Sequence, residues 1–389
     1  MDNFTFHNPT KILFGRGMEN EVGAETARYS HRVLLHFGGG SIKKSGLYDR
    51  VVASLKKAGV EWVELGGVKP NPRLGLVHEG VRLCRERGLD FVLAVGGGSA
   101  IDSAKGVAMG AANDGEVWDF YARKRKPTRA LPVGTVLTIP ATGSEASTAS
   151  VVTNEDGWIK RGFNSELIYP KFSVLNPELA FTLPPFQAAC GAADILSHLM
   201  ERYFTNTRNV AFVDRLLEAT MKTVIAQAPK VLAKPTDYDA WAELMWAGTI
   251  AHNNLLNTGR LGDWGSHDIE HEISAIYDVA HGAGLAVVLP AWTKHVLDHD
   301  VDRFVQWAVR VWDVELDIFD REATARAGIA RLEAFFHSIG LGTTLAALKI
   351  GADRIDEMAR KCTEGDTRVV GHFVKLDTAQ VAKILRLAA

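Results

Sequence analysis

Five side chains able to bind a metal ion are concentrated in two short segments of the sequence. In GAADILSHLMERYF, Asp194 and His198 are four residues apart, a spacing that places both on one face of a helix. In GSHDIEHEISAIYDVAHGAG, His267 and His271 repeat that spacing, and His281 stands directly before a glycine. Carboxylate and imidazole together suit a borderline divalent ion such as iron(II) or zinc, and the side chains alone do not choose between the two. The pattern predicts a metal site.

The second segment is not the metalloprotease motif that it superficially resembles. That motif, HExxH, requires a glutamate directly after the first histidine, whereas the sequence from His267 to His271 reads HDIEH. A non-redox metallohydrolase of another type remains an alternative. So does a nucleotide-binding module in which the histidines are structural, because a single helical histidine is more often structural than a ligand.

Two glycine loops form the second group of chemically interesting residues. Gly38-Gly39-Gly40-Ser41 and Gly96-Gly97-Gly98-Ser99 each follow an apolar run and precede a helical pattern. Glycine lets backbone amides approach a pyrophosphate, and a helix N-terminus adds partial positive charge. Neither loop matches GxGxxG. The alternative is that both are tight turns in which Ser41 and Ser99 cap the following helices.

The elements that must position these residues differ between the two halves of the chain. Apolar runs at residues 32–37, 60–65, 90–95 and 135–140 alternate with helical patterns at 42–59 and 77–87. This alternation predicts a Rossmann-like, doubly wound parallel sheet. At 389 residues two domains are expected.

The domain boundary is expected near residue 180. Residues 173–187 contain three prolines without periodicity, and helical periodicity dominates afterwards, with breaks at Pro235, Gly259, Gly282 and Gly340. We therefore expect an α/β dinucleotide-binding domain over 1–180 and an all-α domain, binding metal and substrate, over 181–389.

Composition and charge exclude several function classes. The 44 Lys+Arg and 46 Asp+Glu residues give a net charge near −2, without a basic run that could follow a phosphate backbone, so nucleic acid is not an expected partner. No stretch of eighteen apolar residues and no secretory leader pattern occurs, so a cytoplasmic protein without a membrane partner is expected. Cys84, Cys190 and Cys362 are widely spaced, as expected for isolated reduced thiols.

Four motifs in order resemble the iron-containing, group III alcohol dehydrogenase family. They are GGGSAIDSAK, TIPATGSEAS, AADILSH and HEISAIYDVAHGAG. FHNPTKILFGRG, GGGSIKKSG and KPNP are most similar to its NADPH-linked butanol dehydrogenase and broad-range aldehyde reductase branch. The likeness extends from about Phe4 to Pro290. One departure is TIPATGSE where many relatives read TTAGTGSE, which affects the expected course of that loop.

The resemblance implies a dehydroquinate-synthase-like architecture with a metal between the cofactor domain and the helical domain. Among the five candidates it assigns Asp194, His198, His267 and His281 as ligands of Fe(II), with zinc possible. It places His271 near the nicotinamide as a catalytic histidine that is not a ligand. The cofactor-binding positions that it implies are Gly38, Gly39, Ser41, Asn71, Gly96, Gly97, Gly98, Ser99, Asp102, Thr138, Thr142 and Lys160.

The implied activity is reversible hydride transfer between a nicotinamide and a small aliphatic aldehyde or alcohol. The cofactor supplies the redox chemistry, the metal acts as a Lewis acid on the substrate oxygen, and His271 could relay the proton. No Arg or Lys suited to a carboxylate substrate flanks the ligand positions, so uncharged aldehydes are expected. The same-fold alternative is a lyase or cyclase of the dehydroquinate synthase type, which needs several basic groups around its substrate. A homodimer is expected from the likeness.

NADP(H) is expected in preference to NAD(H). NAD-selective sites usually place an acid on the ribose 2′-hydroxyl, but the run that ends at Phe37 continues into glycines. Relatives that favour NAD carry an aspartate about where Gly39 stands. Lys43 and Lys44 could supply positive charge to a phosphate, whereas Glu64 is the competing candidate for a ribose-binding acid.

Overall fold

The computed structural model describes residues 1–389 and divides into two compact units. The α/β unit comprises His7–Leu183 and Pro235–Asn253, and the helical unit comprises Met1–Phe6, Pro184–Lys234 and Asn254–Ala389. The expected ranges of 1–180 and 181–389 lie near this division at Leu183. Two segments differ from the expected ranges. Residues 1–6 belong to the helical unit, and residues 235–253 belong to the α/β unit.

The α/β unit contains one six-stranded parallel sheet with the order β1-β8-β5-β4-β2-β3. Its central strands are continuous apolar runs, such as FVLAVG in β4, because helices cover both faces and leave no solvent-facing side. A separate antiparallel pair, β6-β7, completes the strands. The strands are β1 (Lys11–Phe14), β2 (Arg32–Phe37), β3 (Glu61–Leu65), β4 (Phe91–Gly96), β5 (Val133–Leu137), β6 (Ala149–Asn154), β7 (Ile159–Asn164) and β8 (Phe172–Leu175).

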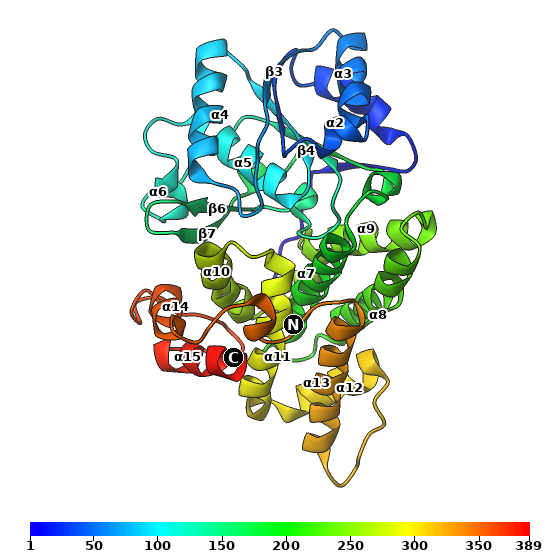
Figure 1. Ribbon diagram of the computed structural model, residues 1–389, viewed down its shortest axis with the longest axis vertical. Helices are drawn as coiled ribbons and strands as arrows, with labels where there is room; N and C mark the ends of the chain where they lie inside the picture. The colour runs from blue at the N-terminus through cyan, green and yellow to red at the C-terminus, as the bar shows by residue number, and fades with distance from the viewer. The chain divides into compact units, whose positions relative to one another are not determined.

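Helices pack on both faces of this sheet and form two cores (Figure 1). On one face lie α1 (Val22–Ala27), α2 (Ser41–Lys44) and α3 (Leu47–Lys57). The opposite core contains residues of α4 (Leu74–Arg87), α5 (Gly98–Ala112), α6 (Trp118–Tyr121) and α9 (Tyr238–His252). The Rossmann-like sheet expected from the sequence is confirmed.

Some elements differ from those expected. The helical pattern at 42–59 is interrupted, because Gly46 has φ of 72° and begins α3 as a separate helix. The sequence does not predict strands β1, β6, β7 and β8, and β8 lies at the start of the proline-containing stretch in which the domain boundary is expected. Gly282 does not interrupt a helix; it is the second residue of one.

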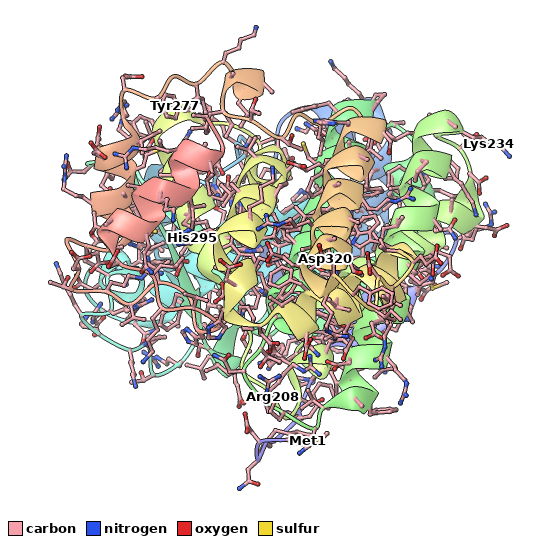
Figure 2. All side chains as sticks on the ribbon, turned by 90° about the horizontal axis from the view of Figure 1, so that it is seen from below. Met1, Arg208, Lys234, Tyr277, His295 and Asp320 are labelled. Carbon is pink, nitrogen blue, oxygen red and sulfur yellow. The ribbon has the colours of Figure 1, made fainter.

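The helical unit contains the remaining long helices, none of which is long and apolar enough to cross a membrane. Its N-terminal residues are tied down: the Met1 ammonium donates to the carbonyl of Arg208 at 2.8 Å (both labelled in Figure 2). The helices are α7 (Pro185–Tyr203), α8 (Ala211–Ala233), α10 (Gly265–Tyr277), α11 (His281–Val296), α12 (Val301–Trp312), α13 (Arg321–Ser338), α14 (Ile355–Cys362) and α15 (Thr378–Leu387).

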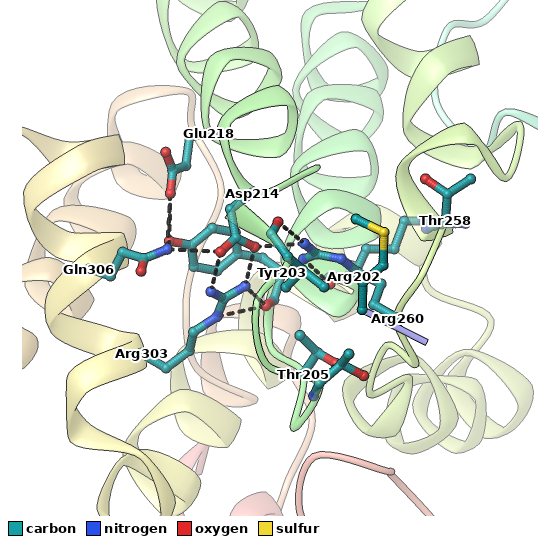
Figure 3. Close-up of polar contacts among 12 residues, drawn as sticks. Arg202, Tyr203, Thr205, Asp214, Glu218, Thr258, Arg260, Arg303 and Gln306 are labelled. Atoms are coloured by element: carbon teal, nitrogen blue, oxygen red, sulfur yellow. Dashed lines mark hydrogen bonds and ion pairs between the residues drawn. The ribbon is translucent and has the colours of Figure 1, made fainter. Parts of the chain in front are cut away.

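A buried ion cluster joins α8, α12 and the end of α7 (Figure 3). Asp214 accepts hydrogen bonds from Arg260 at 2.7 Å and from Arg303 at 2.6 and 2.7 Å. Burial alone would raise the pKa of Asp214, but the two guanidinium groups outweigh it and hold the pKa at about 2. Gln306 extends the cluster to Tyr203 and Glu218. The C-terminal end of α7 is therefore fixed, and α7 carries two of the predicted metal ligands.

Candidate metal centre and nucleotide loops

Three of the four predicted ligands converge on one point of the helical unit. Asp194 on α7, His267 on α10 and His281 at the start of α11 each offer a ligand atom within 4.8 Å of the others. The Nε2 atoms of His267 and His281 both lie 3.9 Å from Oδ1 of Asp194. Asp194 and His267 are buried, while His281 is partly open.

His198 lies beside this group. Its Nδ1 atom is 3.6 Å from Oδ1 of Asp194, and its ring stacks on that of His267 with centroids 4.8 Å apart. It shares a helix face with Asp194, as the spacing predicted, but it is not part of the converging trio.

The donor set fits a divalent cation. Oδ1 of Asp194 and Nε2 of His267 are buried and have no hydrogen-bond partner, a costly state for polar atoms unless a further group satisfies them. Separations of 3.6 to 3.9 Å are too long for hydrogen bonds. They are close to the roughly 3.4 Å between two ligands that are each about 2.1 Å from a tetrahedral ion. Three imidazoles and one carboxylate suit iron(II) or zinc.

Two buried glutamates that the sequence analysis did not single out hold the outer edges of these histidines. Glu201 on α7 accepts from Nδ1 of His267 at 2.8 Å, and Glu270 on α10 accepts from Nδ1 of His281. Burial alone would lower the pKa of His267, but Asp194 and Glu201 outweigh it and raise the pKa to about 9. Glu201 is seven residues beyond Asp194 on one helix face, so the helical spacing could have identified it.

The HGAG sequence at the start of α11 allows this close packing. A Cβ atom on Gly282 would lie 2.0 Å from the carbonyl oxygen of Cys190 on α7, and one on Gly284 would lie 2.5 Å from Oε1 of Glu270. Both positions therefore need glycine for space. His271, the expected catalytic histidine, is half-buried, and its ring centroid lies 5.7 Å from that of His281.

The two glycine loops lie at the carboxyl ends of β2 and β4, which are neighbours in the sheet. Gly97 is the N-cap residue of α5, and a Cβ atom on Gly98 would lie 2.2 Å from Oγ1 of Thr142. Thr138 donates its amide to the carbonyl of Gly96 at 3.0 Å. These contacts bring together four of the predicted cofactor positions, Gly96, Gly98, Thr138 and Thr142.

The alternative in which Ser41 and Ser99 cap the helices that follow the loops is not observed. The N-cap residues of α2 and α5 are Gly40 and Gly97, and neither helix has a side-chain cap. Ser41 and Ser99 lie inside the first turns of the helices instead. Their hydroxyl groups are not engaged in capping those helices.

Asp102 faces the loop after β5. Its carboxylate accepts from Oγ of Ser144 at 2.6 Å and from the amide of Val151 at 3.0 Å. One turn later, buried Lys105 donates to the carbonyls of Ser144, Ser147 and Ala149 at 2.7 to 2.8 Å. These contacts support a role for Asp102 in holding the loop.

Asn71 and Lys160, 89 residues apart in the sequence, meet in the structure. Nζ of Lys160 donates to Oδ1 of Asn71 at 3.0 Å, and both residues are buried. Asn71 has a left-handed backbone with φ of 52°, a conformation that asparagine tolerates better than most residues.

The loop that bears on cofactor preference is open at Gly39. A Cβ atom there would meet nothing within 4 Å, and the residue is exposed. Glu64, the competing acid, is already engaged: it pairs with Lys43 at 3.1 Å and accepts from the hydroxyl of Tyr48. These partners lower the pKa of Glu64, with the Tyr48 contact contributing most.

One basic residue, Arg202, lies close to the predicted metal ligands on α7. Arg202 follows His198 by one helical turn, donates to its carbonyl at 3.0 Å and lies over the ring of Trp264. It is only 1 % exposed, and burial lowers its pKa to about 9. Its guanidinium is therefore occupied inside the helical unit.

Comparisons with known proteins agree with this geometry. The family described as iron-containing alcohol dehydrogenase matches residues 9–177, and the C-terminal domain of the same family matches residues 188–389. The probable NADH-dependent butanol dehydrogenase 1 of Bacillus subtilis is 45% identical, with 99% of each chain covered. The NADPH-dependent aldehyde reductase YqhD of Escherichia coli is 36% identical, with 98% of each covered.

A solved structure is also very similar. The crystal structure of NADH-dependent butanol dehydrogenase A from Thermotoga maritima superposes with a TM-score of 0.96 at 41% identity, covering 100% of this chain and 99% of that one. Together with the family matches over both units, this likeness confirms the resemblance seen in the motifs. The chain belongs to the iron-containing alcohol dehydrogenase family and is an NAD(P)-dependent alcohol dehydrogenase.

Proposed function

We propose that the protein reversibly reduces small, uncharged aliphatic aldehydes to alcohols, with a divalent metal held by Asp194, His198, His267 and His281. The observation that carries the proposal is the convergence of Asp194, His267 and His281, with buried atoms that no hydrogen bond satisfies. Butyraldehyde is the reference substrate, because the names of the relatives include butanol dehydrogenases of 39 to 45% identity.

The division of tasks follows from the contacts. When bound, the ion supplies Lewis acidity toward the substrate oxygen. Glu201 and Glu270 keep the two histidine rings oriented, and Lys105 holds the loop that bears Thr142. His271, half-buried beside His281, is placed to accept or deliver the proton of the alcohol hydroxyl.

The proposed substrate preference is supported by the state of the arginine next to the ligands on α7. Arg202, the nearest guanidinium along α7, is buried and already bonded to the carbonyl of His198. A carboxylate substrate would therefore lose its hydration without a paired charge. Turnover of butyraldehyde should exceed that of a 2-oxo acid of equal length, and the reverse order in kcat/KM would contradict the proposed substrate class.

NADP(H) preference over NAD(H) is part of the proposal. The open space at Gly39 and the pairing of Glu64 with Lys43 support it, because Glu64, the competing candidate for a ribose-binding acid, is already engaged. The names of the relatives do not decide the preference, since they include NADH-dependent and NADPH-dependent enzymes.

The test is steady-state kinetics on anaerobically prepared protein. Butyraldehyde reduction is measured with NADPH and with NADH, before and after Fe(II) is added to metal-free protein. We expect Fe(II)-dependent oxidation of the reduced nicotinamide, with higher kcat/KM for NADPH. Metal-dependent hydrolysis, or an aldehyde-independent reaction, would favour the hydrolase or lyase alternatives.

A further inference from the structure

We propose that Glu201 and Glu270 are positioning residues of the metal site, and that they set the metal affinity by fixing the tautomer and the ring orientation of His267 and His281. The inference rests on the proposed metal function. Each glutamate is buried, and each accepts from the Nδ1 atom of one histidine.

Glu201 is bound from several directions by the first turn of α10. Its Oε1 atom accepts from the side chain of His267 at 2.8 Å, from the amide of His267 at 3.1 Å and from Oγ of Ser266 at 2.5 Å. Its Oε2 atom accepts from the amide of Trp264 at 2.6 Å. A carboxylate on α7 thus fixes both the side chain of a ligand and the helix end that carries it.

Glu270 makes the equivalent contact one helix further along the chain. It lies on α10, three residues after His267, and accepts from His281 at the start of α11. Its side chain is fully buried, and Gly284 leaves space for it. The glutamates therefore link α7 to α10 and α10 to α11.

The consequence for the ligands is geometric. A carboxylate that accepts from Nδ1 keeps the proton there, so the lone pair of a neutral imidazole remains on Nε2. The Nε2 atoms of both histidines lie 3.9 Å from Oδ1 of Asp194, on the side where the ligands converge. Without the glutamates, each ring could rotate and the other tautomer could form. Loss of such a partner typically weakens metal binding 10- to 100-fold.

The test measures metal binding by the full-length protein without using its activity. Metal-free wild type, Glu201→Gln and Glu270→Gln are titrated anaerobically with Co²⁺ in competition with a chromophoric chelator, and the Co²⁺ absorption spectrum is recorded. The matched control is Glu218→Gln. That glutamate is also buried in the helical unit and accepts from Tyr203 at 2.9 Å, but none of its contacts involves a ligand (Figure 3).

We expect Kd for Co²⁺ to rise 10- to 100-fold in Glu201→Gln and Glu270→Gln, with altered spectra, and less than threefold in the control. Because Glu201 also holds the start of α10, thermal unfolding of each metal-free variant checks the fold. Glu270→Gln decides the case, since it replaces the carboxylate that accepts from Nδ1 of His281 and leaves Glu201 in place. A folded Glu270→Gln protein with wild-type Kd and spectrum would overturn the inference.

The inference and the proposed function fail separately. Wild-type protein that binds Co²⁺ or Fe²⁺ but does not reduce aldehydes contradicts the proposed function, while the ratios of Kd still decide the positioning role. Wild-type protein that binds neither ion at micromolar concentration overturns the inference directly.

Discussion

At the scale of single residues, His267 contacts both a predicted metal ligand and a buried glutamate. Its Nε2 atom faces Asp194, and its Nδ1 atom and amide both bind Glu201. We predict that His267→Ala abolishes aldehyde reduction while nicotinamide binding stays within about threefold of wild type, because the glycine loops lie in the other unit.

The matched control is His295→Ala, which removes an imidazole from α11 outside the ligand group (labelled in Figure 2). Thermal unfolding checks that both variants fold. If His267→Ala keeps more than about a tenth of the wild-type rate, a loss of less than about 1.4 kcal/mol in barrier, the ligand assignment is wrong.

Gly39→Asp tests the cofactor preference. An aspartate here meets open space, so it adds a charge without steric conflict. Repulsion from the 2′-phosphate should reduce kcat/KM for NADPH by at least tenfold and change that for NADH far less. Gly39→Asn, of nearly equal size, separates charge from volume. An unchanged ratio between the cofactors in Gly39→Asp, or a higher wild-type kcat/KM with NADH, would refute the preference.

His36 should make stability depend on pH. It is fully buried, and burial lowers its pKa to about 4 despite the hydrogen bond to the carbonyl of Leu65. Between pH 6.5 and about 4 the unfolded chain binds a proton that the folded chain does not, so stability falls as pH falls through this range. The gap corresponds to about 3 kcal/mol.

This expectation is checked by denaturant unfolding of metal-free protein between pH 7.5 and 4.5. His36→Gln should lose part of the wild-type slope, up to about 1.4 kcal/mol per pH unit. His31→Gln, which removes an exposed histidine, should keep it. Equal slopes in His36→Gln and wild type would contradict the assignment.

The sequence predicted the ligand types better than their surroundings. Helical spacing alone placed Asp194 with His198, and His267 with His271, on single helix faces. The closeness of α7, α10 and α11 depends on tertiary packing, such as the contact of Gly282 with the backbone of Cys190, which no local pattern encodes. The pair of Asn71 and Lys160 likewise joins segments 89 residues apart.

At the scale of elements, the central strands were predictable because continuous apolar runs between glycine loops and helices are typical of buried parallel strands. The short edge strand β1 (KILF) and the β6-β7 pair lack that signal, since their residues are only partly buried. The sequence predicts a single helix where the structure has α2 and α3. A glycine such as Gly46 destabilises a helix interior by only about 1 kcal/mol, so the sequence pattern does not exclude a continuous helix.

Lys105 is predicted to hold the loop after β5 in place. Its ammonium donates to three backbone carbonyls, and Lys105→Met would leave all three without that donor. We expect the unfolding free energy to fall by about 3 kcal/mol and Kd for NADPH to rise about tenfold, because the loop carries Thr142, whose side chain lies beside Gly98. Metal affinity should not change.

Lys56→Met, which removes an exposed lysine from α3, serves as the control for the lost charge. Unfolding curves and fluorescence titration with NADPH give the two quantities. Lys105→Met protein with wild-type NADPH affinity would show that the buried ammonium contributes to stability alone.

At the scale of the whole molecule, the predicted functions are separated between the units. All the proposed metal ligands and both positioning glutamates belong to the helical unit, whereas every predicted nucleotide-binding residue belongs to the α/β unit. The metal and the nicotinamide should therefore bind independently when no substrate is present. Removing the metal should abolish turnover and leave Kd for NADPH within about threefold of that of the loaded protein.

The measurement is a fluorescence titration with NADPH before and after treatment with a chelator. Elemental analysis verifies that the chelator has removed all of the metal. Adding Fe(II) back to the same sample should restore aldehyde reduction, and zinc added in parallel tests the choice of ion. Full activity in protein verified as metal-free would show that the reaction does not require the metal. A tenfold or greater loss of NADPH affinity on chelation would show that the units are coupled, because an effect on binding must then pass from the helical residues to the glycine loops.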